Sequence, residues 1–143
     1  MVRVRLEVRM PVEEVFDYFS DFRNENEWNV VAHDVEMLTP PPVGSGSRFA
    51  GQYDRMGRLE YEILEYERPH RFRVRGEAKA FRFLSTFTFS HTAEGTRVDA
   101  TMDPHGKGGM AVLTPLMGGI IKKQMSKGLE SLRQTLERKA TAS

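Results

Sequence analysis

Apolar and polar residues alternate along most of the chain before residue 104, the pattern of strands with one buried and one solvated face. Val2, Val4, Leu6 and Val8 open this pattern, with a charged residue after each. The alternation slips at residues 64–66, which predicts a bulge. We expect seven strands, in the segments 2–9, 34–38, 47–54, 58–68, 71–75, 80–91 and 96–103.

Two short helices are expected between the first and second strands. The first starts at Pro11, which the first turn of a helix tolerates, and Glu13 and Glu14 follow where the helix dipole favours negative charge. Residues 20–21 end this helix and can cap a second one over Phe22–Trp28. The buried side of the first helix is expected to consist of Val12, Val15, Phe16 and Phe19.

The only long segment with helical periodicity runs from Met110 to Arg138. Its apolar residues recur at spacings of three and four, so they line one side of a helix of about seven to eight turns. They are Leu113, Met117, Ile120, Ile121, Met125, Leu129, Leu132 and Leu136. The opposite side is charged and includes Arg133 and Glu137, one turn apart. We expect the whole apolar side to be buried against the sheet.

Composition fits one domain over residues 1–143, with a flexible tail at 140–143. The net charge is +1 with acids and bases interspersed, so no nucleic-acid groove is indicated. No cysteine is present, which excludes disulfides and thiol catalysis. No signal-peptide core and no membrane-spanning run is seen, so we expect a cytoplasmic protein without stable membrane insertion.

Four loose motifs, in a consistent order, resemble the START-like superfamily, the polyketide cyclase/dehydratase and lipid-transport group also called SRPBCC or Bet v 1-like. The first is Pro11–Phe16, followed by Asp21 and Trp28. The others are Val43–Phe49, Glu65–Phe72 and Glu94–Val98. Together with the long C-terminal helix, the resemblance covers essentially the whole chain.

This resemblance implies an α+β helix-grip fold, in which a curved seven-stranded antiparallel sheet wraps the last helix and leaves an apolar cavity between them. Members of the group include aromatase/cyclases and lipid-carrying proteins. No catalytic pattern of a characterised branch transfers to these residues. The resemblance therefore predicts a cavity without identifying its ligand.

The residues expected to line this cavity lie on the inward side of the predicted strands and on the apolar side of the helix. Plentiful aromatic and methionine side chains favour a cavity over a filled core. Gly118 and Gly119 interrupt the apolar half of the helix, which suggests close approach by a strand, a kink or a ligand. The predicted lining is Trp28, Phe49, Tyr53, Tyr61, Ile63, Phe72, Val74, Phe81, Phe83, Phe87, Val98, Met102, Met110, Leu113, Met117, Ile120 and Ile121. Trp28 can equally be an ordinary core anchor.

Candidate catalytic residues are polar groups expected near this cavity. Tyr53, Tyr61 and Ser85 lie in the inward phase of their strands, where they could stabilise an enolate or protonate a leaving hydroxyl. His33 and His105 fall in segments that could border the cavity mouth. No histidines have the spacing of a helical metal site, so no metal is expected. We also expect no organic cofactor.

Three functions stay open at this point. The leading one is binding of a small hydrophobic molecule, lipid-like or aromatic polyketide-like. The second is a cofactor-free cyclase or dehydratase that uses the same cavity, and the third is a module that acts through its surface. Residues 108–121 are apolar and precede Lys122, Lys123 and Lys127, a pattern suited to transient contact with a membrane or an acyl carrier. The sequence does not indicate an oligomeric state.

Overall fold

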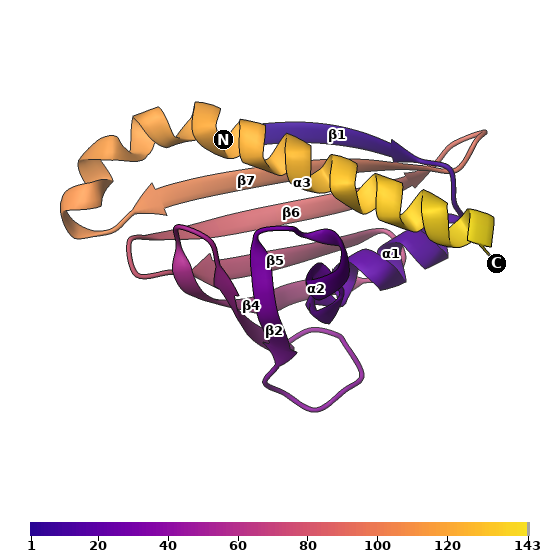
Figure 1. Cartoon of the computed structure of the whole chain (residues 1–143), viewed down its shortest axis with the longest axis horizontal. Coiled ribbons are helices and arrows are strands. Elements are labelled where there is room, and N and C mark those ends of the chain that lie inside the picture. Colours follow the sequence, from indigo (N-terminus) through magenta and orange to yellow (C-terminus); the bar gives the residue numbers. More distant parts are fainter. Residues whose placement is uncertain (143) are drawn as a thin grey trace.

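A single antiparallel sheet carries three α-helices on one face in the computed structural model, which describes residues 1–142 (Figure 1). The strands are ordered β1-β7-β6-β5-β4-β3-β2. They are β1 (Val2–Val8), β2 (Ala32–Met37), β3 (Arg48–Tyr53), β4 (Gly57–Glu67), β5 (Arg71–Glu77), β6 (Phe81–His91) and β7 (Thr96–Gly106). The helices are α1 (Val12–Ser20), α2 (Glu25–Trp28) and α3 (Thr114–Ala142), with 3-10 turns η1 (Phe22–Asn24) and η2 (Gly108–Leu113). The predicted α+β helix-grip architecture is confirmed.

An aromatic core forms between α1 and the inner face of the sheet, meaning the face that carries the helices. Phe16 and Phe19 of α1 are buried, as their helical spacing predicts. Phe19 contacts Phe72 and Phe87 edge to face, at ring-centroid distances of 5.7 and 4.7 Å. Such pairs add about 0.5–1.5 kcal/mol each beyond the contribution of area burial. Because these rings are buried against one another, this end of the inner face is a filled core.

Two details of the strands follow from their neighbours. The pairing of β4 with β5 shifts between Ile63 and Glu65, which confirms the predicted bulge. The expectation that β7 ends at Asp103 is wrong, because pairing with β6 continues to Gly106. Pro104 is tolerated in this strand because β1 begins opposite Met102 and leaves the far side of β7 without a partner beyond it.

Only the second half of α3 is buried, so the expectation that its whole apolar side packs on the sheet is wrong. Leu129, Leu132 and Leu136 are buried, whereas Leu113 and Ile120 are exposed. The main sheet contacts of α3 are with β1 and β7, and its first turns extend past the start of β1 (Figure 1). Those turns therefore have less sheet beneath them than the periodicity alone suggested.

The ends of α3 also differ from the expected boundaries. Residues 110–113 form a 3-10 turn rather than the first turn of the α-helix. At the other end, α3 continues through Ala142, so residues 140–142 are helical and exposed. The last residue of the expected tail, Ser143, lies outside the described residues. No helix within residues 1–142 has the length and apolar character needed to cross a membrane.

Candidate functional site

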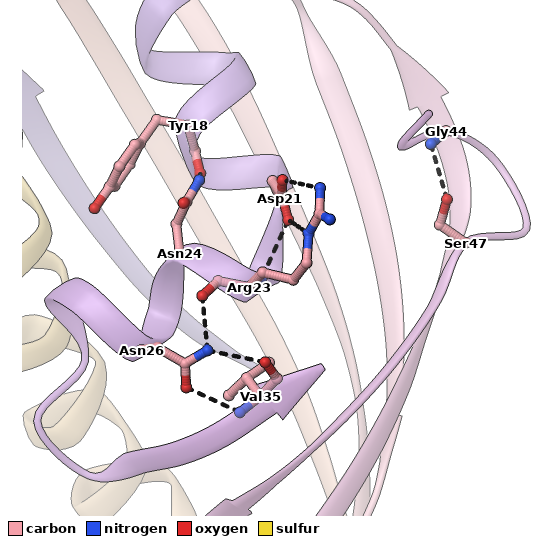
Figure 2. Close-up of polar contacts among 8 residues, drawn as sticks. All are labelled: Tyr18, Asp21, Arg23, Asn24, Asn26, Val35, Gly44 and Ser47. Atoms are coloured by element: carbon pink, nitrogen blue, oxygen red, sulfur yellow. Dashed lines mark hydrogen bonds and ion pairs between the residues drawn. The ribbon is translucent and has the colours of Figure 1, made fainter. Parts of the chain in front are cut away.

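The segment between α1 and β2 is held by side-chain contacts to the backbone. The Asp21 carboxylate accepts a hydrogen bond from the Arg23 backbone N–H at 3.1 Å, which confirms the predicted cap. Asn26 of α2 bonds both backbone groups of Val35, donating to its carbonyl at 2.8 Å and accepting from its N–H at 2.9 Å. Figure 2 shows both interactions. The clamp fixes α2 against β2 and so orients its neighbour Glu25.

Glu25 is a buried carboxyl group that contacts two tyrosines predicted to point inward. The hydroxyl oxygens of Tyr53 and Tyr61 each lie 3.0 Å from the Oε1 atom of Glu25, within hydrogen-bond distance, and the two hydroxyls also contact each other. Asn29 donates its Nδ2–H to the Oε2 atom of Glu25 at 2.7 Å. We call Glu25, Asn29, Tyr53 and Tyr61 the polar cluster.

Hydrogen counting favours the neutral form of the Glu25 carboxyl. Three oxygens, Oε1 of Glu25 and the hydroxyl oxygens of Tyr53 and Tyr61, form a triangle with three contacts. A neutral carboxyl supplies the third hydrogen, so each oxygen donates once around the ring. An ionised carboxyl leaves one contact without a hydrogen.

Burial also favours the neutral form of the Glu25 carboxyl. It raises the pKa of Glu25 above its ordinary value of 4.5, partly opposed by the hydrogen bonds from Asn29, Tyr53 and Tyr61. Burial also raises the pKa of Tyr53 and of Tyr61, and ionisation of Glu25 would raise both pKa values further. The cluster can therefore hold one exchangeable proton between a carboxyl and two phenols.

Glu25 was not among the predicted site residues, and its neighbours Asn24, Asn26 and Glu27 are all polar. A signal was present: Phe22, Glu25 and Trp28 are spaced by three residues, which places them on one side of a helical segment. Phe22 and Trp28 are both buried. A carboxyl between two buried aromatic residues on one side indicates an inward-pointing acid.

Beyond the filled core, the inner face of the sheet continues as a partly exposed apolar floor. Phe83 lies over Gly76, where an added Cβ would be 2.1 Å from the Phe83 ring, so a larger residue at this position would displace the ring. Phe81, Phe83 and Met102 are half-buried, unlike the sealed residues beneath α1. We call these three residues the apolar floor.

A buried hydroxyl and the rings of the polar cluster border this floor. Ser85 lies between Met102 and Val74 in the pairing of β6, and its buried Oγ has no hydrogen-bond partner among the described residues. Tyr61 pairs with Gly76, which in turn pairs with Phe83. Polar groups therefore lie beside the floor on neighbouring strands.

The predicted helix residues separate into two groups in the structure. Met117, Ile121 and Met125, spaced by four, are half-buried and form an inner stripe on α3. Met110, Leu113 and Ile120 are exposed, so the structure does not bring them into the interior. An added Cβ at Gly118 or Gly119 meets nothing within 4 Å, which rules out strand packing as the reason for either glycine.

Most of the remaining predicted lining residues belong to one continuous buried core. They are Trp28, Phe49, Ile63, Phe72, Val74, Phe87 and Val98. Trp28 packs edge to face on Phe19 at 5.9 Å, and its Cζ3 would lie 3.7 Å from a Cβ at Gly128. It acts as a core anchor, although its buried Nε1–H has no partner among the described residues.

Both candidate histidines are separated from the polar cluster. His33 and His105 are exposed and lie in the outward phase of β2 and β7, next to Ala32 and Pro104 that point inward. Their Nε2 atoms lie 3.0 Å from Asp54 and 3.4 Å from Asp103, respectively. Within residues 1–142, no three His, Asp or Glu side chains converge as a metal site would require.

Two open surface hollows lie away from the apolar floor. One, of about 660 Å³, is lined by Asn26 and residues 32–36. The other, of about 650 Å³, lies where the ends of β1 and α3 meet and is lined largely by charged residues. Neither includes a residue of the floor or of the inner stripe.

Comparison with known proteins finds a family model and a relative that each match nearly the whole chain. The family model described as "Polyketide cyclase / dehydrase and lipid transport" matches residues 1–137. An uncharacterised Mycobacterium tuberculosis protein, Rv1546, is 23% identical, with 96% of this chain and 98% of that protein covered.

Solved structures share the fold at low sequence identity. TTHA0849 from Thermus thermophilus has a TM-score of 0.80 at 21% identity, with 99% of both chains covered. The di-domain aromatase/cyclase StfQ from the steffimycin biosynthetic pathway has a TM-score of 0.78 at 13% identity, with 97% of this chain and 51% of that chain covered. At these identities the matches establish the fold.

Proposed function

Because the chain belongs to the polyketide cyclase/dehydrase and lipid transport family, we propose that it binds a small hydrophobic molecule, lipid-like or aromatic polyketide-like. The proposed site lies between the apolar floor and the inner stripe of α3. The observation that carries the proposal is the half-burial of apolar side chains on both sides, on a face that α1 seals elsewhere. Covering them with a hydrophobic molecule is favourable by about 25 cal/mol for each Å² of apolar surface removed from water.

Native mass spectrometry of the purified protein tests whether such a molecule co-purifies with it. Titration with 1-anilinonaphthalene-8-sulfonate, a fluorescent hydrophobic probe, then locates the site. Met117→Trp fills the proposed space and is expected to weaken probe binding at least tenfold. Leu116→Trp is the matched control, because Leu116 is the neighbouring residue and is exposed. Equal affinity in the two variants would refute this location.

A second candidate function, acid–base catalysis on the bound molecule, is supported by the polar cluster. A neutral Glu25, relayed through Tyr61, would protonate a ketone oxygen while an enol carbon bonds to that carbonyl carbon. The enol proton would return to the carboxylate, so the cluster ends in its starting state. This is the proton balance of an aldol cyclisation without metal or organic cofactor.

The two candidates differ in a turnover assay with a synthetic poly-β-ketone thioester. If the protein is an enzyme, it accelerates cyclisation over buffer, and Tyr61→Phe and Glu25→Gln each lower the rate while probe binding is retained. If wild-type protein does not exceed the buffer rate, the catalytic candidate is refuted and the binding function is unaffected.

A further inference from the structure

The η2 turn and the start of α3 expose an unusual group of apolar side chains. Val112, Leu116 and Ile120 are 80%, 71% and 67% exposed, and Met110 and Leu113 are also exposed. Single exposed apolar residues are normal, but a contiguous group marks an interaction surface. We call the segment 110–120 the docking segment.

Positive charge directly follows this apolar group. Leu116, Ile120, Lys123 and Lys127 are spaced by four, three and four residues, so they share one side of α3. Lys122 lies beside them, and none of these three lysines forms an ion pair within the described residues. Residues 104–129 contain no Asp or Glu. The surface therefore combines an apolar patch with cations that form no ion pair within the described residues.

One glycine pair precedes the docking segment and a second pair lies inside it. Gly108 and Gly109 precede it, and Gly118 and Gly119 lie near its end. An added Cβ at any of the four meets nothing within 4 Å, so packing does not require glycine there. Glycine in a helix costs about 0.5–1 kcal/mol relative to alanine. Gly108 has a φ of 54°, which favours glycine, whereas Gly109, Gly118 and Gly119 have no such backbone requirement.

We propose that the docking segment binds the surface of a bilayer that contains anionic lipid. The apolar side chains would enter the boundary between headgroups and acyl chains, and Lys122, Lys123 and Lys127 would contact anionic headgroups. A second copy of the chain meeting the same stretch would offer no acid to these lysines. A lipid surface supplies both the apolar layer and the negative charge without requiring a shaped partner.

Docking goes beyond the proposed ligand-binding function and does not depend on it. If both hold, the inner stripe of α3, which starts within the docking segment at Met117, comes close to the acyl chains. A hydrophobic molecule could then pass between the bilayer and the apolar floor without crossing bulk water. This route suits a ligand that is stored in lipid.

Vesicle flotation at low salt tests the proposal with full-length protein. Vesicles of phosphatidylcholine alone are compared with vesicles that also contain phosphatidylglycerol. Each lysine near an anionic surface contributes about fivefold in binding, so Lys123→Glu together with Lys127→Glu is expected to reduce flotation by more than tenfold. Leu116→Ser together with Ile120→Ser is expected to abolish it.

Matched controls use exposed residues away from the docking segment. Val30→Ser removes an apolar side chain that is 81% exposed, and Lys79→Glu reverses an exposed charge, so both should float like the wild type. Circular dichroism checks that every variant is folded. No flotation of the wild type, or equal flotation of the wild type and both double variants, would overturn the proposal.

Two further results would reassign the surface to a protein partner. One is a wild-type dimer by light scattering that Leu116→Ser with Ile120→Ser converts to monomer, without vesicle binding. The other is binding to an acyl-loaded carrier protein without vesicle binding. Either outcome overturns the membrane proposal.

Discussion

Replacing Glu25 by Gln isolates the energetic effect of the buried carboxyl. The folded state holds the Glu25 proton above its ordinary pKa of 4.5, whereas the unfolded chain releases it near that value. As pH rises above 4.5, the unfolded state therefore binds fewer protons than the folded state, and wild-type stability falls until the raised pKa is passed. The full slope for one proton is about 1.4 kcal/mol per pH unit.

The variant should lose this slope. A glutamine can donate from Nε2 to one tyrosine and accept from Asn29 through Oε1, but it cannot also accept from the second tyrosine. One lost hydrogen bond costs about 0.5–1.5 kcal/mol, so the variant is less stable than wild type at pH 4.5. The difference narrows as pH rises, because only wild type contains the titrating carboxyl.

Urea unfolding between about pH 4.5 and 8, followed by circular dichroism, measures both curves. Glu27→Gln is the control, because Glu27 is an exposed acid on the same helix. A hydrogen bond from Tyr18 lowers the pKa of Glu27, so its stabilisation is present above pH 4.5 and is lost as pH falls. Parallel curves for wild type and Glu25→Gln above pH 4.5 would refute the assignment of a neutral buried carboxyl.

Three further predictions concern the packing around the site. Leu132→Ala should lower the free energy of unfolding by about 2–5 kcal/mol because Leu132 is fully buried, whereas Leu116→Ala should change it by less than about 0.5 kcal/mol; chemical denaturation measures both. Gly118→Ala with Gly119→Ala should stabilise the fold by about 1–2 kcal/mol in a thermal melt, and destabilisation would contradict the open space around them. Asn26→Ala should cost about 1–3 kcal/mol by breaking the clamp on Val35, and a melting temperature equal to wild type would contradict that role.

The periodicity of the sequence predicted the elements of this fold because each strand and helix has a local apolar side. The alternation at Val2–Val8 and the spacing of Phe16 and Phe19 correspond to β1 and to the buried side of α1. Periodicity does not show what covers an apolar side. The apolar spacing continues through Leu113 in η2 and Ile120 in α3, but η2 and the first turns of the helix extend past β1, and both residues are exposed (Figure 1).

The polar cluster depended on contacts between distant segments, which local patterns do not contain. The inward phase of Tyr53 and Tyr61 was readable from their strands. Their convergence on Glu25 required the register of β3 with β4 and the clamp that fixes α2 against β2. The sequence likewise did not show on which face of their strands His33 and His105 lie. The structure places both on the outward face, where they are exposed.

Methyl NMR of methionine-labelled protein titrated with 1-anilinonaphthalene-8-sulfonate tests the proposed ligand site most directly. Met102 lies in the apolar floor and Met117 and Met125 lie in the inner stripe, while Met56 is exposed in the turn before β4. The proposal predicts that the Met102, Met117 and Met125 signals shift together and saturate while Met56 stays unchanged. Shifts confined to Met56, or no saturable shift at the other three methyl groups, would contradict a binding site between sheet and helix.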